Sequence, residues 1–347
     1  MNTNLKSLFG EARPLHKTAY EYRVSGGSGK GGGIPGGIQV IDPQGNFRPN
    51  AVFGTVIFAD YANGADTNNG LNAGNAVKTF SKALSLVTTN KQDIVVMRGN
   101  STYVETAMVS NTKSRFTVVG DNSGRLYGQD VKVSATITTG ATNIATFQNT
   151  GVRCAFGGIK FINSSTVTEG IYCVADGGEY SVYANCEIYK DTDLDETTAA
   201  EFLHNCDSLQ MFNCTIGSSA NIVADNVIRP NMKLTATLSG KKARDSYIYN
   251  TIFRSKAGGT EHVMVYGANA TDVERELTLE QCKFLNNPLS AATPAHAVGF
   301  GAAQTEGSVF LKDCSSVDHT VMAQASVGVY VDGAVPTFAT SGVSVLT

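Results

Sequence analysis

Two short runs of acidic residues are the parts of this sequence best suited to chemistry. In the first, Asp191, Asp193 and Asp195 alternate within the segment Asp191–Glu196. Carboxylates at alternate positions of a loop can present oxygen ligands to Ca²⁺. An EF-hand loop, however, has glycine at its sixth position, where this segment has Glu196. We therefore expect a solvated loop and no metal site, with the three aspartates as the only candidate ligands.

The second run has Asp272, Glu274 and Glu276 at alternate positions. In a β-strand these three side chains would share one face. A glycoside hydrolase needs two carboxylates about 5–10 Å apart on such a face. Three like charges in a row, however, more often form a solvated surface than a catalytic pair. We expect a solvated surface here as well.

Other groups that could act as bases or nucleophiles are scattered along the chain. The five histidines have no evident nucleophile beside them, and they are His16, His204, His262, His296 and His319. The chain also lacks tryptophan, a common platform for sugars, although it has 13 tyrosines. We therefore predict no catalytic residue and no cofactor, and we lean toward a protein that is not an enzyme. If it is one, a polysaccharide lyase or a glycoside hydrolase is the expected class.

The elements that would position such residues form an internal repeat. When its six-residue copies are aligned, each position forms a column. The third column is polar or glycine, and it recurs every 27–37 residues, with Gly158 to Asn185 the shortest step and Asn213 to Asn250 the longest. The first, fourth and sixth columns are mainly apolar or small. The six copies are Phe156–Phe161, Tyr183–Ile188, Met211–Ile216, Ile248–Phe253, Leu279–Phe284 and Leu311–Ser316.

The columns predict two short strands joined by a bend. Apolar residues alternate at the fourth and sixth positions, as in a half-buried strand, and the alternation slips by one residue at the third position. Asparagine tolerates the left-handed conformation that a tight bend needs. A repeat of this length stacks equivalent positions about 4.8 Å apart, so we predict an all-β fold, a parallel β-helix (solenoid) of about ten coils.

Four cysteines occupy the fourth column of the repeat. They are Cys186, Cys214, Cys282 and Cys314. Stacked inward side chains on neighbouring coils point the same way, so we expect reduced thiols that pack in the core and form no disulfides.

The segment ahead of the repeat carries a recognisable pattern. It contains Asp60, Asn63-Gly64, Asp66 and Asn69-Gly70, then Gly99 through Tyr103 to Glu105. These residues resemble the N-terminal segment of pectate-lyase-like right-handed parallel β-helix proteins. The resemblance covers about fifty residues, and the repeat extends it to about residue 317. It implies a right-handed β-helix, in a family that includes lyases, glycosidases, adhesins and phage tail and head proteins.

A short helix is expected within this segment. Phe80, Ala83, Leu84 and Val87 fall on one helical face. Such a helix would cover the open N-terminal end of the solenoid, which otherwise exposes unpaired strand edges.

Two regions are expected. Residues 1–50 form a flexible glycine-rich N-terminal anchoring arm, in which Lys30 is followed by Gly31, unlike the lysine of a phosphate-binding loop. Residues 51–347 form the β-helix, with an N-terminal cap over 51–110 and a C-terminal cap over about 320–347. The candidate binding residues of the arm are Leu5, Phe9, Leu15, Tyr20 and Tyr22.

The composition excludes two classes of binding partner. With 27 basic and 30 acidic residues the net charge is −3, so no nucleic acid is expected, and no apolar run is long enough for a membrane span. We see no export signal and expect synthesis in the host cytoplasm. Together with the resemblance, these features predict a non-enzymatic structural protein of a phage virion, a homotrimer that the arm anchors to the capsid as a decoration or head-fibre protein. The alternative is a phage tailspike that binds or depolymerises host surface polysaccharide, with capsid or tail proteins as partners in either case.

Overall fold

The computed structural model describes residues 21–23, 39–41, 47–48, 54–99, 102–121, 131–135, 144–164, 171–191, 199–218, 228–236, 240–287, 292–324, 328–332 and 343–345. The chain divides into two compact units, Met1–Phe53 and Gly54–Thr347. In the first unit, β1 (Glu21–Arg23), β2 (Gln39–Ile41) and β3 (Phe47–Arg48) form an antiparallel sheet in that order. Tyr22 lies in β1, whereas Leu5, Phe9, Leu15 and Tyr20 lie outside the described residues. The anchoring role of these five residues stays a prediction.

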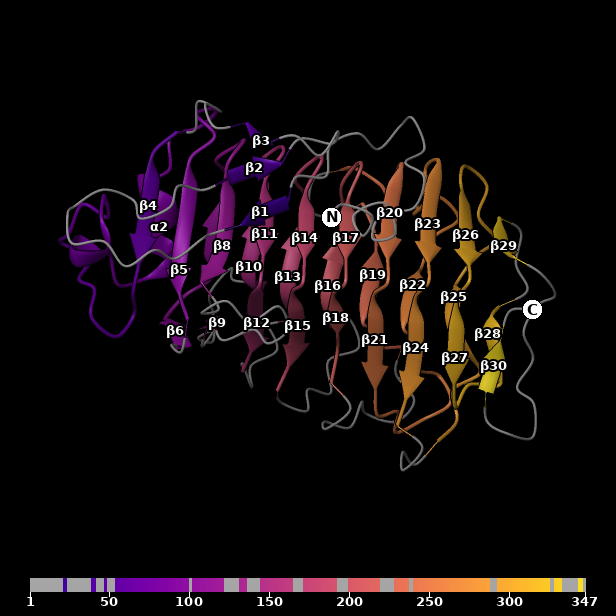
Figure 1. Cartoon of the computed structure of the whole chain (residues 1–347). Helices are drawn as coiled ribbons and strands as arrows, with labels where there is room; N and C mark the ends of the chain where they lie inside the picture. Colours follow the sequence, from indigo (N-terminus) through magenta and orange to yellow (C-terminus); the bar gives the residue numbers. More distant parts are fainter. Residues whose placement is uncertain are drawn as a thin grey trace, which may run out of the picture. The chain divides into compact units, whose positions relative to one another are not determined.

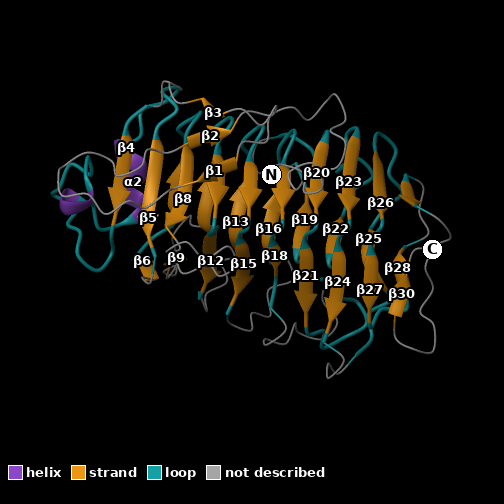
Figure 2. Ribbon diagram, in the orientation of Figure 1, coloured by secondary structure: helices purple, strands orange, loops and turns teal. Residues whose placement is uncertain are grey.

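The second unit is built from three sheets whose strands stack coil upon coil (Figures 1 and 2). The ten-stranded sheet contains β4 (Val56–Ala59), β5 (Ile94–Arg98), β8 (Thr117–Asp121), β11 (Ala155–Gly157), β14 (Val182–Ala184), β17 (Gln210–Phe212), β20 (Ser246–Tyr249), β23 (Glu276–Glu280), β26 (Ser308–Lys312) and β29 (Val329–Val331). The nine-stranded sheet contains β6 (Thr102–Glu105), β9 (Val131–Ala135), β12 (Ile159–Asn163), β15 (Glu187–Lys190), β18 (Thr215–Ile216), β21 (Ile252–Ser255), β24 (Lys283–Asn286), β27 (Ser315–Val317) and β30 (Val343–Val345). The eight-stranded sheet contains β7 (Val109–Asn111), β10 (Ala145–Asn149), β13 (Tyr172–Asp176), β16 (Ala200–His204), β19 (Met232–Leu234), β22 (Val265–Gly267), β25 (His296–Phe300) and β28 (Val321–Ala323).

Each coil from β5 to β28 contributes one strand to each sheet, and neighbouring coils pair in parallel. The first column of the sequence repeat stacks in register along the ten-stranded sheet, as Phe156 on Tyr183, Tyr183 on Met211, and onward to Leu311. The fold is therefore a right-handed parallel β-helix, as predicted.

The bend between the ten-stranded and nine-stranded sheets is a single left-handed residue. Gly158, Asn185, Asn213, Asn250, Gln281 and Asp313 all have φ between 46° and 66°. Their backbone N–H groups continue the ladder around the bend; that of Asn213, for example, donates to the Tyr249 carbonyl at 3.1 Å. The predicted bend at the polar third column is confirmed.

A second corner with the same geometry precedes the ten-stranded sheet. Arg115, Arg153, Tyr180 and Ser208 also have φ near 58°, each two residues before its strand. The N–H of each donates to a carbonyl of the next coil, as Tyr180 does to Asp207 at 3.0 Å. The sequence did not indicate this corner, because its residue types have nothing in common.

Side chains from all three sheets fill the interior of the solenoid. All four cysteines of the fourth column are buried and free, which confirms the predicted ladder. Each thiol donates to two carbonyls; Cys214 Sγ, for example, donates to those of Tyr183 and Phe212 at 3.5 Å each. Aromatic rings stack along the same axis, with centroids 5.1 Å apart for Phe156 and Tyr183.

A short helix packs against the first coils. It is α2 (Phe80–Leu86), and the 3₁₀ helix η1 (Ala73–Asn75) precedes it. Phe80, Ala83, Leu84 and Val87 are buried against β4, β5, β6 and β7, as the predicted helical face requires. Within the described ranges no helix is long and apolar enough to cross a membrane.

The last strands of the second unit end the stack in two ways. In β29, Val329 and Val331 pack against the core, so this strand adds one more parallel rung beside β26. In contrast, β30 pairs antiparallel with β27. The order of parallel strands in the nine-stranded sheet therefore stops at β27.

The left-handed bend predicts an asymmetric response to substitution at Gln281, whose side chain is exposed. Gln281→Gly should keep or raise the stability, because glycine adopts positive φ without strain. Gln281→Val should lower it by about 1–2 kcal/mol, because a β-branched residue is strained there. Chemical denaturation measures both changes. The matched control is Lys283→Val, at an exposed residue of β24. An equal loss in Gln281→Val and Lys283→Val would contradict the bend argument.

Candidate functional site

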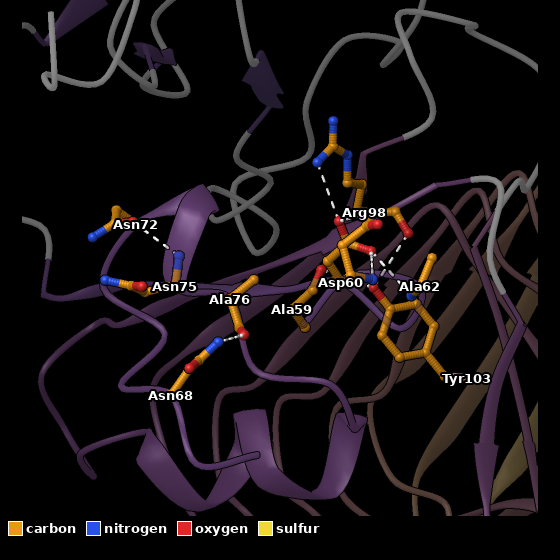
Figure 3. Close-up of polar contacts among 10 residues, drawn as sticks. Ala59, Asp60, Ala62, Asn68, Asn72, Asn75, Ala76, Arg98 and Tyr103 are labelled. Carbon is orange, nitrogen blue, oxygen red and sulfur yellow. Dashed lines mark hydrogen bonds and ion pairs between the residues drawn. The ribbon is translucent and has the colours of Figure 1, made fainter. Parts of the chain in front are cut away.

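The aspartate-rich N-terminal segment builds a corner of the fold (Figure 3). Asp60 Oδ1 accepts hydrogen bonds from the N–H groups of Ala62 and Asn63, each at 3.1 Å, and its Oδ2 pairs with Arg98 Nη1 at 3.1 Å. Burial raises the pKa of Asp60, but the hydrogen bonds from Asn63 and Arg98 outweigh it and lower the pKa below its usual value. The Tyr103 hydroxyl donates to the Ala59 carbonyl at 2.8 Å and closes the corner.

Two further acidic residues of this segment hold the start of α2. Asp66 Oδ1 accepts from the N–H groups of Lys78 and Thr79, each at 2.9 Å. Glu105, from β6, accepts from the Phe80 N–H at 2.8 Å and the Ser81 hydroxyl at 2.8 Å. These carboxylates satisfy the free N–H groups at a helix start, so their role in this segment is structural.

The predicted metal candidates are only partly described. Asp191 is exposed, and its Oδ2 accepts from the Ser164 hydroxyl at 2.8 Å. Asp193 and Asp195 lie outside the described residues. Among the residues that are described, no three histidine, cysteine or acidic side chains are placed to share a metal ion.

The expectation that Asp272, Glu274 and Glu276 share a strand face is wrong. Strand β23 begins only at Glu276, and the preceding residues form a turn. Asp272 is buried and accepts from the Asn269 N–H at 2.8 Å, whereas Glu274 pairs with Arg244 at 3.4 Å. The charges of Asp272 and Glu274 therefore serve different contacts: Asp272 accepts a hydrogen bond within the turn, and Glu274 forms an ion pair with Arg244.

The histidines of the second unit are mainly core residues. His204, His262 and His319 are buried, and burial lowers their pKa values to about 3, about 3 and about 4. His204 Nε2 lies 3.0 Å from Ser246 Oγ, but both groups are enclosed in the core, away from any surface substrate.

The strongest candidate site is the outer surface of the ten-stranded sheet near its C-terminal end. We call it the aromatic face, and it comprises Phe212, Tyr247, Tyr249, Phe310 and Tyr330. These side chains alternate with core residues along their strands; in β20, Ile248 points inward between two half-buried tyrosines. Tyr330 is 54% exposed.

The rings of the aromatic face lie in two clusters. Tyr247 and Tyr249 are nearly parallel, at 17° and 6.2 Å, and Phe212 is 6.2 Å from Tyr247. Phe310 and Tyr330 are stacked at 19° and 5.3 Å.

Polar groups of the intervening coil separate the two clusters. The Tyr247 hydroxyl donates to Glu280 Oε2 at 3.0 Å, and the Thr278 hydroxyl donates to Glu276 Oε1 at 2.6 Å. Burial, and next the nearby Glu280 carboxylate, raise the pKa of Tyr247, so its hydroxyl stays protonated. Lys312 Nζ lies 5.8 Å from the centre of the Phe310 ring. Rings that alternate with hydroxyl, carboxylate and ammonium groups suit a ligand that has both C–H faces and hydroxyls.

No protein-family model matches this chain, and no curated protein matches it by sequence. Solved structures do resemble it. Pectin methylesterase from Aspergillus niger aligns with 82% of this chain and 85% of its own, at 11% identity and a TM-score of 0.54. Pectin methylesterase PemA from Erwinia chrysanthemi covers 84% of each chain at 9% identity and a TM-score of 0.48. Geobacillus virus E2 ORF18 covers 68% of this chain and 57% of its own, at 11% identity and a TM-score of 0.30. The first likeness shows the fold that this chain shares with carbohydrate-active enzymes, and at this identity it shows the fold alone.

The structural role of the N-terminal carboxylates can be tested at Glu105. Glu105→Ala removes the acceptor of the buried Phe80 N–H and of the Ser81 N–H at the start of α2, and it should cost about 1–3 kcal/mol of unfolding free energy. Glu105→Gln keeps an amide oxygen in place and should retain most of the stability. Chemical denaturation of the two variants separates the outcomes. Equal losses would show that the carboxylate charge, and not its acceptor geometry, is what the helix requires.

Proposed function

We propose that this chain is a non-enzymatic structural protein of a phage virion, anchored to the capsid through residues 1–50 as a decoration or head-fibre protein. The observation that carries the proposal is the division of the chain into a small N-terminal unit and a long solenoid. A sequence as rich in glycine as residues 25–37 buries little apolar surface alone and suits contact with a partner, so we assign attachment to residues 1–50.

The β-helix is well suited to a mechanical role. Parallel ladders run along three sheets, and the backbone bonds continue through both left-handed corners. Bending or shearing the stack breaks hydrogen bonds in all three sheets together, so the solenoid is stiff. The sequence resemblance to β-helix proteins that include phage head and tail components supports the same role.

A phage tailspike that binds host surface polysaccharide is the second candidate, and the aromatic face is the observation that favours it. Aromatic rings that alternate with Glu280, Thr278 and Lys312 match the alternating apolar and hydroxyl surfaces of a sugar chain. Cleavage would also require an acid–base pair. The described carboxylates beside the aromatic face on β23 are Glu276 and Glu280, and their positions four residues apart on one strand separate their backbones by about 13 Å, beyond the spacing of a glycosidase pair. We therefore expect binding without cleavage.

Attachment through the arm can be tested by deleting residues 1–50. The shortened chain should keep the β-sheet circular dichroism of the full chain but fail to bind particles that lack this protein. Cosedimentation of the particles with full-length and shortened chains measures the difference. Particle binding by the shortened chain would place the anchor in the β-helix and contradict the proposal.

The second candidate predicts a specific loss on the aromatic face. The double variant Tyr247→Ala/Tyr249→Ala should weaken binding to purified host surface polysaccharide at least tenfold, since buried aromatic contacts dominate such interfaces. Affinity electrophoresis measures this, with Tyr189→Ala on the nine-stranded sheet as the control. The polysaccharide should keep its length during the assay. Equal binding by all three proteins would remove the aromatic face as a sugar site.

A further inference from the structure

A column of polar side chains runs through the core of the solenoid. Asn111, Asn149, Asp176 and His204 occupy the same inward position of β7, β10, β13 and β16 and pair in register. None is more than 1% exposed. A buried polar group without a hydrogen bond lowers the stability of the fold. The hydrogen bonds of these four side chains therefore decide whether the column stabilises or destabilises this part of the core.

The two amides of the column pass hydrogen bonds in one direction. Asn111 Nδ2 donates to Asn149 Oδ1 at 2.7 Å, and Asn149 Nδ2 donates to Asp176 Oδ1 at 3.0 Å. A third amide would accept with its oxygen and donate onward with its nitrogen. The residue in that place is instead a carboxyl group, which can donate only when it is protonated.

The two oxygens of Asp176 have different surroundings. Oδ1 accepts from Asn149 Nδ2, from the Gly178 N–H at 2.8 Å and from the Ser181 hydroxyl at 3.2 Å. Among the described residues Oδ2 has no hydrogen-bond partner, and neither does the buried hydroxyl of Tyr183. The Tyr183 hydroxyl lowers the pKa of Asp176, but the larger effect of burial raises it.

Among the described residues, no positive charge compensates the carboxyl group. The titratable groups that face it from the described elements around it are Cys154, Tyr183, His204 and Cys206. Burial raises the pKa values of the two thiols and of the phenol, and it lowers that of His204 to about 3, so all four are neutral near pH 7. Burial also raises the pKa of Asp176 to about 6.

We propose that Asp176 is a pH-sensitive element of the solenoid, a fully buried carboxyl group with no counter-ion among the described residues, and that its ionisation weakens the coils from β10 to β17. The protonated group places no charge in the core. The ionised group keeps the three donors to Oδ1, but its charge is enclosed and Oδ2 has no hydrogen-bond partner among the described residues.

The direction of the effect follows from proton binding. The unfolded chain loses the Asp176 proton near pH 3.8, whereas the folded chain keeps it up to about pH 6. The folded state therefore binds more protons between these values, and this contribution to stability decreases as the pH rises through that window. The lowered pKa values of His204, His262 and His319 act the other way, because their contribution is lost as the pH falls below about 6.5.

The variant Asp176→Asn isolates the carboxyl group. Its Oδ1 keeps the three donors, and its side chain is uncharged at every pH. The three histidines are present in both proteins, so their effect cancels in the comparison. We expect amide hydrogen exchange in β10, β13 and β16 to be equal in variant and wild type near pH 4. At pH 8 it should be slower in the variant by up to about a hundredfold, the factor that corresponds to two pH units of linkage.

Asp191→Asn, which changes an exposed carboxylate, is the matched control and should leave exchange unchanged at both pH values. Infrared spectroscopy of Glu201→Gln, in which Asp176 is intact, supplies a second readout that does not depend on the folding of Asp176→Asn. Glu201 is replaced because burial raises its pKa to about 7, so it would give a band of its own. A buried carboxylic-acid carbonyl band should be present at pH 5 and absent at pH 8. A pH-independent difference between Asp176→Asn and wild type, or no such band at pH 5, would overturn the proposal.

Discussion

In each coil whose turn between the ten-stranded and nine-stranded sheets is described, the chain turns at one residue, and that residue has a positive φ. This local constraint fixes the register of everything that follows. One residue more or less would move the next strand's core side chains to the outside. Because the N–H groups of five bend residues, from Gly158 to Gln281, also donate to the next coil, these bends are part of the hydrogen-bonded stack. The corner before the ten-stranded sheet repeats this arrangement with different residue types.

Constant register has consequences inside and outside the solenoid. Inside, it places similar side chains above one another. This produces the cysteine ladder, the parallel rings of Phe253 and Phe284, and the polar column from Asn111 to His204 that contains Asp176. Outside, it aligns side chains that are far apart in the sequence, so that Tyr247 and Phe310 meet the same surface. The aromatic face and the pH-sensitive carboxyl group both arise from this alignment.

The features that could be predicted from the sequence are those that repeat in residue type. The bends at Asn185 and Asn213 and the cysteine column recur in recognisable form, and the helical face of Phe80, Ala83 and Leu84 follows from its spacing. The second corner could not be found, because Arg153, Tyr180 and Ser208 share only a backbone conformation. The aromatic face was missed for a similar reason: its outward column also contains Gln210 and Thr278, so no periodic signal marks it. The prediction that Asp272, Glu274 and Glu276 share a strand face was wrong, because charged residues can alternate in a turn as they do in a strand.

We propose that the chain has two parts with different tasks: an N-terminal unit that attaches to the particle, and a stiff solenoid that forms the projecting part. A cryo-EM reconstruction of the virion that encodes this chain tests that division most directly. We predict β-helix density at regular positions of the capsid lattice, joined to it through residues 1–50. Density confined to the tail tip would contradict the capsid assignment and favour the tailspike, and absence of the protein from the particle would contradict the virion role itself.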